Sequence, residues 1–204
     1  MKNKALILII LTMGLFSCST TKKVEKLFSK SKNPENQTFH FEQLNGLPAP
    51  VKAYFRYALE EGQPYLSNLR LKHTGRFKTG VNKDWVDIKG EQYFITQPPG
   101  FFWIGKTKAF KATDSYVSDQ GNLSVYLFGF LRIVNSKGKT VDQAELLRWL
   151  GESVWMPTNL LPNDYISWSA INDSTSKLTM NYSGISVYYD VHFNDRGQIT
   201  KLET

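Results

Sequence analysis

The chain has 204 residues, a formal net charge of +7 at pH 7 and one cysteine. Because one thiol forms neither an internal disulfide nor a zinc site made of thiolates, we expect no cross-link of either kind. The basic charge is not concentrated in an arginine-rich cluster or an RNA-binding motif, so nucleic acid is not an expected partner. The length is sufficient for one domain with a hydrophobic core.

Residues 1–17 have the pattern of a secretory signal peptide. Lys2 and Lys4 precede an almost wholly apolar run over residues 5–16. A helix needs roughly 20 residues to cross a bilayer, so this run is too short for a relaxed membrane span. A basic start followed by a short apolar run and small residues is instead typical of a segment that is cleaved during export.

The stretch LFSC, from Leu15 to Cys18, resembles the lipoprotein box of bacteria. The resemblance implies cleavage after Ser17, acylation of Cys18 and stable attachment to a membrane, since two acyl chains suffice for anchoring. Ser19 stands where an aspartate would retain a lipoprotein in the inner membrane, so the resemblance implies the periplasmic face of the outer membrane. Two alternatives stay open: a plain signal peptide followed by a free thiol, and a membrane anchor that is never cleaved.

Residues 18–38 are polar and rich in lysine, which predicts a flexible tether between the lipidated cysteine and the folded part. Within it, Val24, Leu27 and Phe28 are spaced as one apolar turn of a helix, which would lie on the membrane surface. We expect a single folded domain over residues 39–204.

Two helices are predicted in this domain. In residues 47–62, apolar side chains recur at helical spacing from Val51 onward. In residues 140–153, Thr140 and Gln143 have the spacing of a capping box at a helix start. The apolar side of this second helix consists of Leu146, Leu147 and Leu150.

From Asn68 onward, apolar and polar residues alternate, which is the period of antiparallel strands with one buried face. In residues 68–78, the exposed side carries a basic stripe of Arg70, Lys72 and Arg76. Further strands are expected over residues 84–96, 101–106, 110–118, 122–134, 165–171, 177–183, 185–193 and 198–203. The pattern predicts an α+β domain: a strongly curved antiparallel sheet of about eight or nine strands, forming an incomplete barrel, with the two helices packed on it.

Two aromatic stretches lack the polar alternation of a one-sided sheet. QPPGFFWIG (97–105) and LSVYLFGFLRIV (123–134) place apolar side chains on both faces of their predicted strands. Either a helix covers the second face, or the sheet encloses a cavity for an acyl chain or a similar apolar ligand. The residues expected to line such a cavity are Phe101, Phe102, Trp103, Tyr126, Phe128, Phe130 and Trp155.

Evidence for catalysis is weak. The chain contains no GxSxG elbow and no phosphate-binding loop, and its three histidines are too scattered for a metal site, so no metal or other cofactor is expected. Asp190 and His192 share a strand face, a pattern more often solvent-facing than catalytic. Glu152, three residues before Trp155, is a weak catalytic candidate that would act as a buried general acid, cap backbone amides or lie in solvent.

Three motifs, PPGFFW, ATDSYVSDQGNLSVYLFG and LLRWLGESVWMP, together resemble an uncharacterised bacterial family of unknown function, over residues 47–202. The resemblance implies no activity. It marks as motif residues Pro99, Phe101, Trp103, Asp114, Tyr116, Gly121, Glu152, Trp155 and Pro157. The order of helices and strands is also similar to that of lipoprotein carriers of the envelope, which are half barrels plugged by helices, although no motif is shared.

The leading hypothesis is a membrane-anchored envelope lipoprotein without enzymatic activity, which binds an apolar or lipid-like ligand in a cavity of the curved sheet. Its expected partners are the membrane, through acylated Cys18, and an apolar small molecule. The basic stripe would then meet lipid headgroups. Two alternatives stay open: a scaffold that binds an unknown protein through a sheet edge, and an envelope hydrolase that uses Glu152 with Asp114.

Overall fold

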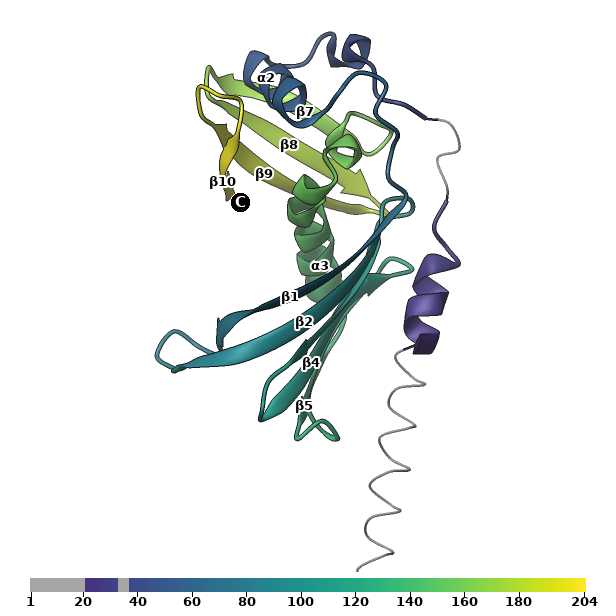
Figure 1. Cartoon of the computed structure of the whole chain (residues 1–204), viewed down its shortest axis with the longest axis vertical. Coiled ribbons are helices and arrows are strands. Elements are labelled where there is room, and N and C mark those ends of the chain that lie inside the picture. The colour runs from purple at the N-terminus through teal and green to yellow at the C-terminus, as the bar shows by residue number, and fades with distance from the viewer. Residues whose placement is uncertain (1–20, 33–36) are drawn as a thin grey trace, which may run out of the picture.

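The computed structural model describes residues 21–32 and 37–204. These residues form two antiparallel sheets, of six and four strands, with helices packed against them (Figure 1). The α+β class is confirmed, but the strands form two sheets and not the single sheet that we expected. The sheets are separate because a helix and two short 3₁₀ turns stand between the sixth strand and the seventh. The predicted signal peptide and Cys18 lie outside the described residues.

The six-stranded sheet is a meander, in which each strand pairs with the next. Its strands are β1 (Asn68–Lys78), β2 (Trp85–Ile95), β3 (Gly100–Lys106), β4 (Phe110–Val117), β5 (Gln120–Leu127) and β6 (Leu131–Ser136). The turns β1–β2, β3–β4 and β5–β6 therefore lie together at one end of the strands, which we call the tip end. The basic stripe predicted for β1 lies on its exposed side.

The strand that we predicted over residues 122–134 is wrong, because a hairpin turn divides it into β5 and β6. Phe128 and Gly129 have positive φ angles of 51° and 82°, and the N–H of Phe130 donates to the carbonyl of Leu127 at 3.2 Å. This backbone pattern is that of a tight turn with left-handed residues at both central positions, which favours glycine, asparagine or aspartate there. A phenylalanine at the first of them conceals the turn in the sequence.

The four-stranded sheet has one buried face and one exposed face. Its strands are β7 (Ile166–Asn172), β8 (Thr175–Tyr182), β9 (Ile185–Phe193) and β10 (Ile199–Glu203). The buried face carries the apolar residues of β8 and β9, and α2 (Ala49–Ala58) and α3 (Lys139–Glu152) pack against it. Three 3₁₀ turns complete the fold: η1 (Phe41–Leu44), η2 (Ser153–Trp155) and η3 (Pro157–Leu160).

Helix α3 lies between the two sheets and contacts both (Figure 1). On the six-stranded sheet, the Trp149 ring stacks on Phe94, with ring centres 5.5 Å apart, and its indole N–H donates to the Ile95 carbonyl at 3.0 Å. From β9, the Tyr189 hydroxyl donates to the Leu147 carbonyl at 3.2 Å. The capping box predicted at the start of α3 is absent, because the N-cap residue is Gly138 and no side chain caps the helix. One hydrophobic core thus runs from one sheet to the other through α3.

Residues 21–28, which we placed in a flexible tether, are helical and packed on the six-stranded sheet. Leu27 is fully buried against Phe102 and Ile104, and Phe28 meets Tyr93 edge to face at 5.8 Å. This N-terminal helix covers part of the outer face, over β2 and β3, opposite to the inner face on which α3 lies. It explains why β3 is apolar on both sides. Within the two described ranges, no helix is long and apolar enough to cross a membrane.

The packing of the N-terminal helix predicts a local effect of Leu27→Ala. A buried leucine truncated to alanine loses about 2–5 kcal/mol of packing and transfer energy. We expect amide hydrogen exchange in residues 24–31 to accelerate strongly, while β2 and β3 stay protected. Lys26→Ala, at an exposed position of the same helix, should leave exchange unchanged. Equal protection in both variants would show that the helix does not depend on this contact.

Candidate functional site

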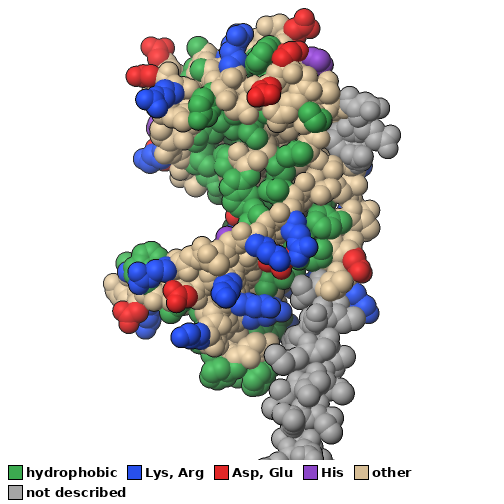
Figure 2. Space-filling model, in the orientation of Figure 1, with side chains coloured by type: hydrophobic (Ala, Val, Ile, Leu, Met, Phe, Trp, Pro, Cys, Tyr) green, Lys and Arg blue, Asp and Glu red, His purple; other side chains and the backbone are tan. Residues whose placement is uncertain are grey.

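The inner face of the six-stranded sheet changes from buried to open along the strands. At the end far from the tips, Phe94, Phe101 and Tyr116 form a cross-strand row that is fully buried in the core. Toward the tip end, the inner-face residues are apolar, and most are only half-buried or exposed. We call this set the open inner face; it comprises Phe77, Val86, Ile88, Phe110, Ala112, Val125, Leu127 and Val134. Figure 2 shows a hollow between the two sheets, with acidic and histidine side chains at its floor.

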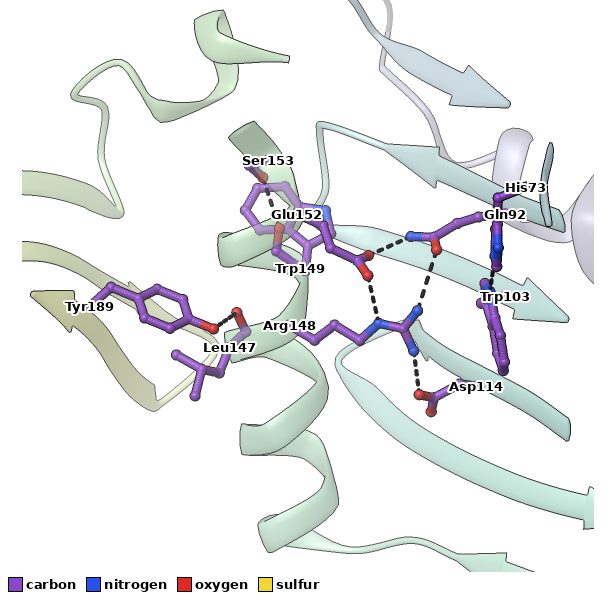
Figure 3. Close-up of polar contacts among 10 residues, drawn as sticks. All are labelled: His73, Gln92, Trp103, Asp114, Leu147, Arg148, Trp149, Glu152, Ser153 and Tyr189. Carbon is purple, nitrogen blue, oxygen red and sulfur yellow. Dashed lines mark hydrogen bonds and ion pairs between the residues drawn. The ribbon is translucent and has the colours of Figure 1, made fainter. Parts of the chain in front are cut away.

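A cluster centred on Arg148 lies at the border between the covered part and the open part of the inner face. Arg148 reaches from α3 to the cross-strand row formed by Gln92, Trp103 and Asp114 (Figure 3). Its guanidinium pairs with Asp114, and with Glu152 at 2.9 Å between Nε and Oε1. Gln92 donates to Glu152 Oε2 at 2.5 Å and accepts from Arg148 at 3.3 Å. We call these four residues and Glu145 the Arg148 cluster: Gln92, Asp114, Glu145, Arg148 and Glu152.

Two aromatic rings hold the guanidinium in place. Its carbon lies 4.8 Å from the ring centre of Phe101 and 5.4 Å from that of Trp103. A cation over an aromatic face is attracted to the ring electrons, and more strongly so where water is excluded. Arg148 is therefore bound by its charge to two carboxylates and by its flat faces to the sheet, which fixes the position of α3.

The surroundings of Glu145 favour its protonated form. Its burial, followed by the hydrogen bond and the charge of Asp114, raises the pKa of Glu145 to about 9. Glu145 Oε2 and Asp114 Oδ1 are both buried and would have no partner if both groups were ionised. A proton on Glu145 removes this conflict, because the acid then donates to the carboxylate.

Trp103 and His73 form a flat aromatic floor next to the Arg148 cluster. The indole N–H of Trp103 donates to His73 Nε2 at 2.9 Å, and the ring planes differ by only 11°. In this bond His73 Nε2 is the acceptor. A Cβ added at Gly90 would lie 2.0 Å from His73 Nε2, and one at Gly105 would lie 2.2 Å from the Trp103 ring. The two glycines therefore allow the rings to lie flat on the strands.

The structure does not bring the seven predicted cavity residues together. Of the three on β3, Phe101 is buried under α3, Phe102 lies under the N-terminal helix and Trp103 faces the hollow. Tyr126 is on the outer face of β5. Phe128 and Phe130 are in the exposed β5–β6 turn, and Trp155 is exposed in η2. Neighbours in a strand point to opposite faces, which separates the first three. Of the seven, only Trp103 borders the open inner face.

The carboxylates of the hydrolase hypothesis do come together, and both are engaged by Arg148. Glu152 accepts hydrogen bonds on both oxygens, and Asp114 is bound by Arg148 and by protonated Glu145. Asp190 does not orient His192, because it pairs with Lys177 at 2.8 Å. His192 bonds to Glu203 and Thr175 instead. Among residues 21–32 and 37–204, no group of three or more metal-ligating side chains is placed to hold a metal ion.

Sequence reasoning missed Arg148, Gln92, Glu145 and the role of His73. Glu145 and Arg148 precede Glu152 on the same helix by seven and four residues. The same side of the helix carries Leu146, Trp149 and Leu150, and burying a charged side chain there costs free energy unless the charge is paired. The spacing of Glu145, Arg148 and Glu152 therefore indicated an ion-pair cluster. Gln92 gave no such signal, because only the register of β2 with β3 brings it to the cluster.

Removing the charge of Arg148 tests the cluster. Arg148→Met keeps much of the side-chain volume but leaves Asp114 and Glu152 without a counter-charge. We expect the free energy of unfolding to fall by about 2–3 kcal/mol, somewhat less than for a fully buried ion pair, since water reaches part of these side chains. The triple variant Arg148→Met/Asp114→Asn/Glu152→Gln should recover part of the loss. Denaturant unfolding measures the free energy of unfolding of the wild type and of both variants. Equal losses in the single and the triple variant would mean that Arg148 acts through packing alone.

The proton on Glu145 predicts a pH dependence. The unfolded chain releases this proton near pH 4.5 and the folded chain near pH 9. The wild type therefore loses stability as the pH rises between these values, whereas Glu145→Gln keeps a donor and does not titrate. We expect the stability of the variant, relative to the wild type, to increase over this range by at least about 1 kcal/mol. Glu42→Gln, at an exposed site, should give a constant difference. A constant difference for Glu145→Gln as well would show that Glu145 is ionised.

Comparison with known proteins gives a family and no function. Searches among curated proteins and among solved structures found no match. One family model, described as a family of unknown function, DUF6544, matches residues 37–204. These residues hold both sheets, α2, α3 and the Arg148 cluster. The chain therefore belongs to the DUF6544 family of unknown function.

Proposed function

We propose that the chain is a membrane-anchored lipoprotein of the bacterial cell envelope and that it binds an apolar or lipid-like ligand on the open inner face. The anchor is Cys18, on the strength of the LFSC motif that follows an apolar export signal. In this proposal, the six-stranded sheet is the curved wall of an incomplete barrel, with α3 at its closed side. The periplasmic face of the outer membrane is the proposed location.

The observation that carries the ligand proposal is the apolar surface that α3 leaves open. Strands with one face in water normally alternate apolar and polar residues. Here the outer face already has its basic and polar residues, and the inner face is apolar as far as Phe77 and Val86. Burying a side chain the size of valine or phenylalanine contributes about 1.5–3 kcal/mol, so a few such contacts are sufficient for micromolar binding after the cost of association.

The Arg148 cluster and His73 indicate the orientation of such a ligand. They border the open inner face at the end away from the tips, so a polar group would lie there and the apolar body would extend toward the tip end. With Glu145 protonated, one arginine faces two carboxylates, and the cluster has a net charge of −1. A neutral or cationic polar group therefore fits better than a phosphate or a carboxylate.

The two tryptophans of the predicted cavity, Trp103 and Trp155, provide a matched test. In a chain that begins at residue 21, we expect Trp103→Ala to weaken the binding of the apolar fluorophore N-phenylnaphthylamine by about tenfold, or ~1.4 kcal/mol. Trp155→Ala, at a position that is 46% exposed in η2, should bind as the wild type does. Fluorescence titration measures both dissociation constants. If neither variant differs from the wild type, the fluorophore does not bind next to Trp103.

Neighbouring residues of β5 test which face binds. Val125 lies on the open inner face, and Tyr126 lies on the outer face. A carboxylate that must lose its water on contact with an apolar ligand opposes binding. We therefore expect Val125→Glu to abolish fluorophore binding and Tyr126→Glu to preserve it, in samples shown to be folded by circular dichroism. The reverse result would place the ligand on the outer face.

A further inference from the structure

Exposed apolar side chains gather at the tip end of the six-stranded sheet. Among the described residues, twelve large apolar side chains are exposed, and seven of them lie in or beside the β1–β2 and β5–β6 turns. These seven are Phe77, Val81, Trp85, Phe128, Phe130, Leu131 and Ile133. Figure 2 shows green hydrophobic groups at the ends of the two lower arms of the molecule. Such a concentration on one side of a protein marks an interaction surface.

Basic side chains surround these apolar groups. Between residues 76 and 87, 106 and 111, and 128 and 133, the charged residues are Arg76, Lys78, Lys83, Lys106, Lys108, Lys111 and Arg132, against Asp84 and Asp87. Lys106 and Lys23 are close enough to Lys111 to lower its pKa, after the larger effect of burial. The tip end therefore combines apolar groups with an excess of positive charge, the composition of surfaces that bind anionic lipid.

The conformation of the β5–β6 turn also points to a surface role. Phe128 has a left-handed backbone, which is unfavourable for a side chain of this size, yet the residue is 68% exposed and belongs to neither hydrophobic core. Phe130, two residues later, is 66% exposed. The turn thus presents two aromatic rings to the surroundings.

The described chain begins on the same side. At the start of the N-terminal helix, Lys23 lies over Phe102 and near Lys106 and Lys111, beside the β3–β4 turn. Past the other end of the helix, Lys30 bonds to Ser118, in the turn at the opposite end of the strands. Cys18 precedes Thr21 by only three residues, so an acyl anchor on Cys18 belongs to the side of the tips.

We propose that the tip end docks on an anionic phospholipid bilayer, with the apolar side chains of the β1–β2 and β5–β6 turns among the acyl chains and the basic side chains at the headgroups. The open inner face ends at these tips, so a ligand would pass between bilayer and protein without crossing water. The inference rests on the membrane anchor of the proposed function, and it does not depend on the ligand.

The depth of single labels in a bilayer tests this proposal. Full-length chain carrying Val81→Cys, Phe130→Cys or Asp173→Cys is purified from membranes, labelled with a polarity-sensitive fluorophore and reconstituted in vesicles of phosphatidylethanolamine and phosphatidylglycerol. Residue 173 is exposed in the β7–β8 turn of the other sheet and provides the matched control. The full-length chain without an added cysteine, treated with the same reagent, reports on Cys18. An acylated Cys18 takes no label. A free Cys18 thiol takes the label, and this result would refute the lipid anchor but not the docking of the tip end.

We expect the labels at 81 and 130 to shift to the blue and to lose most of their emission when lipids with quencher-bearing acyl chains are included. The label at 173 should show neither change. Replacing phosphatidylglycerol with phosphatidylcholine should reduce the effect at both tips. Emission at 81 and 130 that matches that at 173 would overturn the proposal. A blue shift without lipid quenching would also overturn it, because a protein surface and not a bilayer would then cover the tips.

Discussion

The ion pairing of Arg148 is the interaction on which the relative placement of the two sheets depends. Asp114 and Glu152 come from the six-stranded sheet and from α3, and they would repel each other without the guanidinium between them. Phe101 and Trp103 hold the guanidinium flat, and the proton on Glu145 removes a third negative charge. Because α3 also packs on β9, the helix that the cluster ties to the six-stranded sheet also contacts the four-stranded sheet.

This arrangement concentrates the charged groups at one border and leaves the rest of the inner face apolar. The cluster pairs its arginine with two carboxylates and keeps a net charge of −1, and the rings of His73 and Trp103 lie flat over Gly90 and Gly105. From this floor to the tips, the inner face offers apolar contacts and no further charged side chain. The N-terminal helix covers the part of the opposite face formed by β2 and β3, and the apolar inner face is the surface on which we propose that a ligand binds.

Most elements could be predicted from the sequence, because they follow local periodicity: α2, α3 and nearly all strands lie within a few residues of their expected bounds. The features that escaped prediction depend on contacts distant in sequence. The sequence predicted that Val24, Leu27 and Phe28 share one face of a helix, but it did not predict which strands this face covers. The division into two sheets follows from which strands pair, and the Arg148 cluster follows from cross-strand register. Phe128 concealed its turn because its backbone conformation is rare for that residue.

The central claim is that the open inner face holds an apolar ligand in the cell. Native mass spectrometry of the full chain, extracted from its own membrane in mild detergent and followed by lipid analysis, tests it most directly. We predict a discrete additional mass that is released on denaturation and is lost in Val125→Glu but kept in Tyr126→Glu. If every preparation of the folded chain has only the mass of the protein without a ligand, the claim is contradicted. The open inner face would then be a contact surface for a protein.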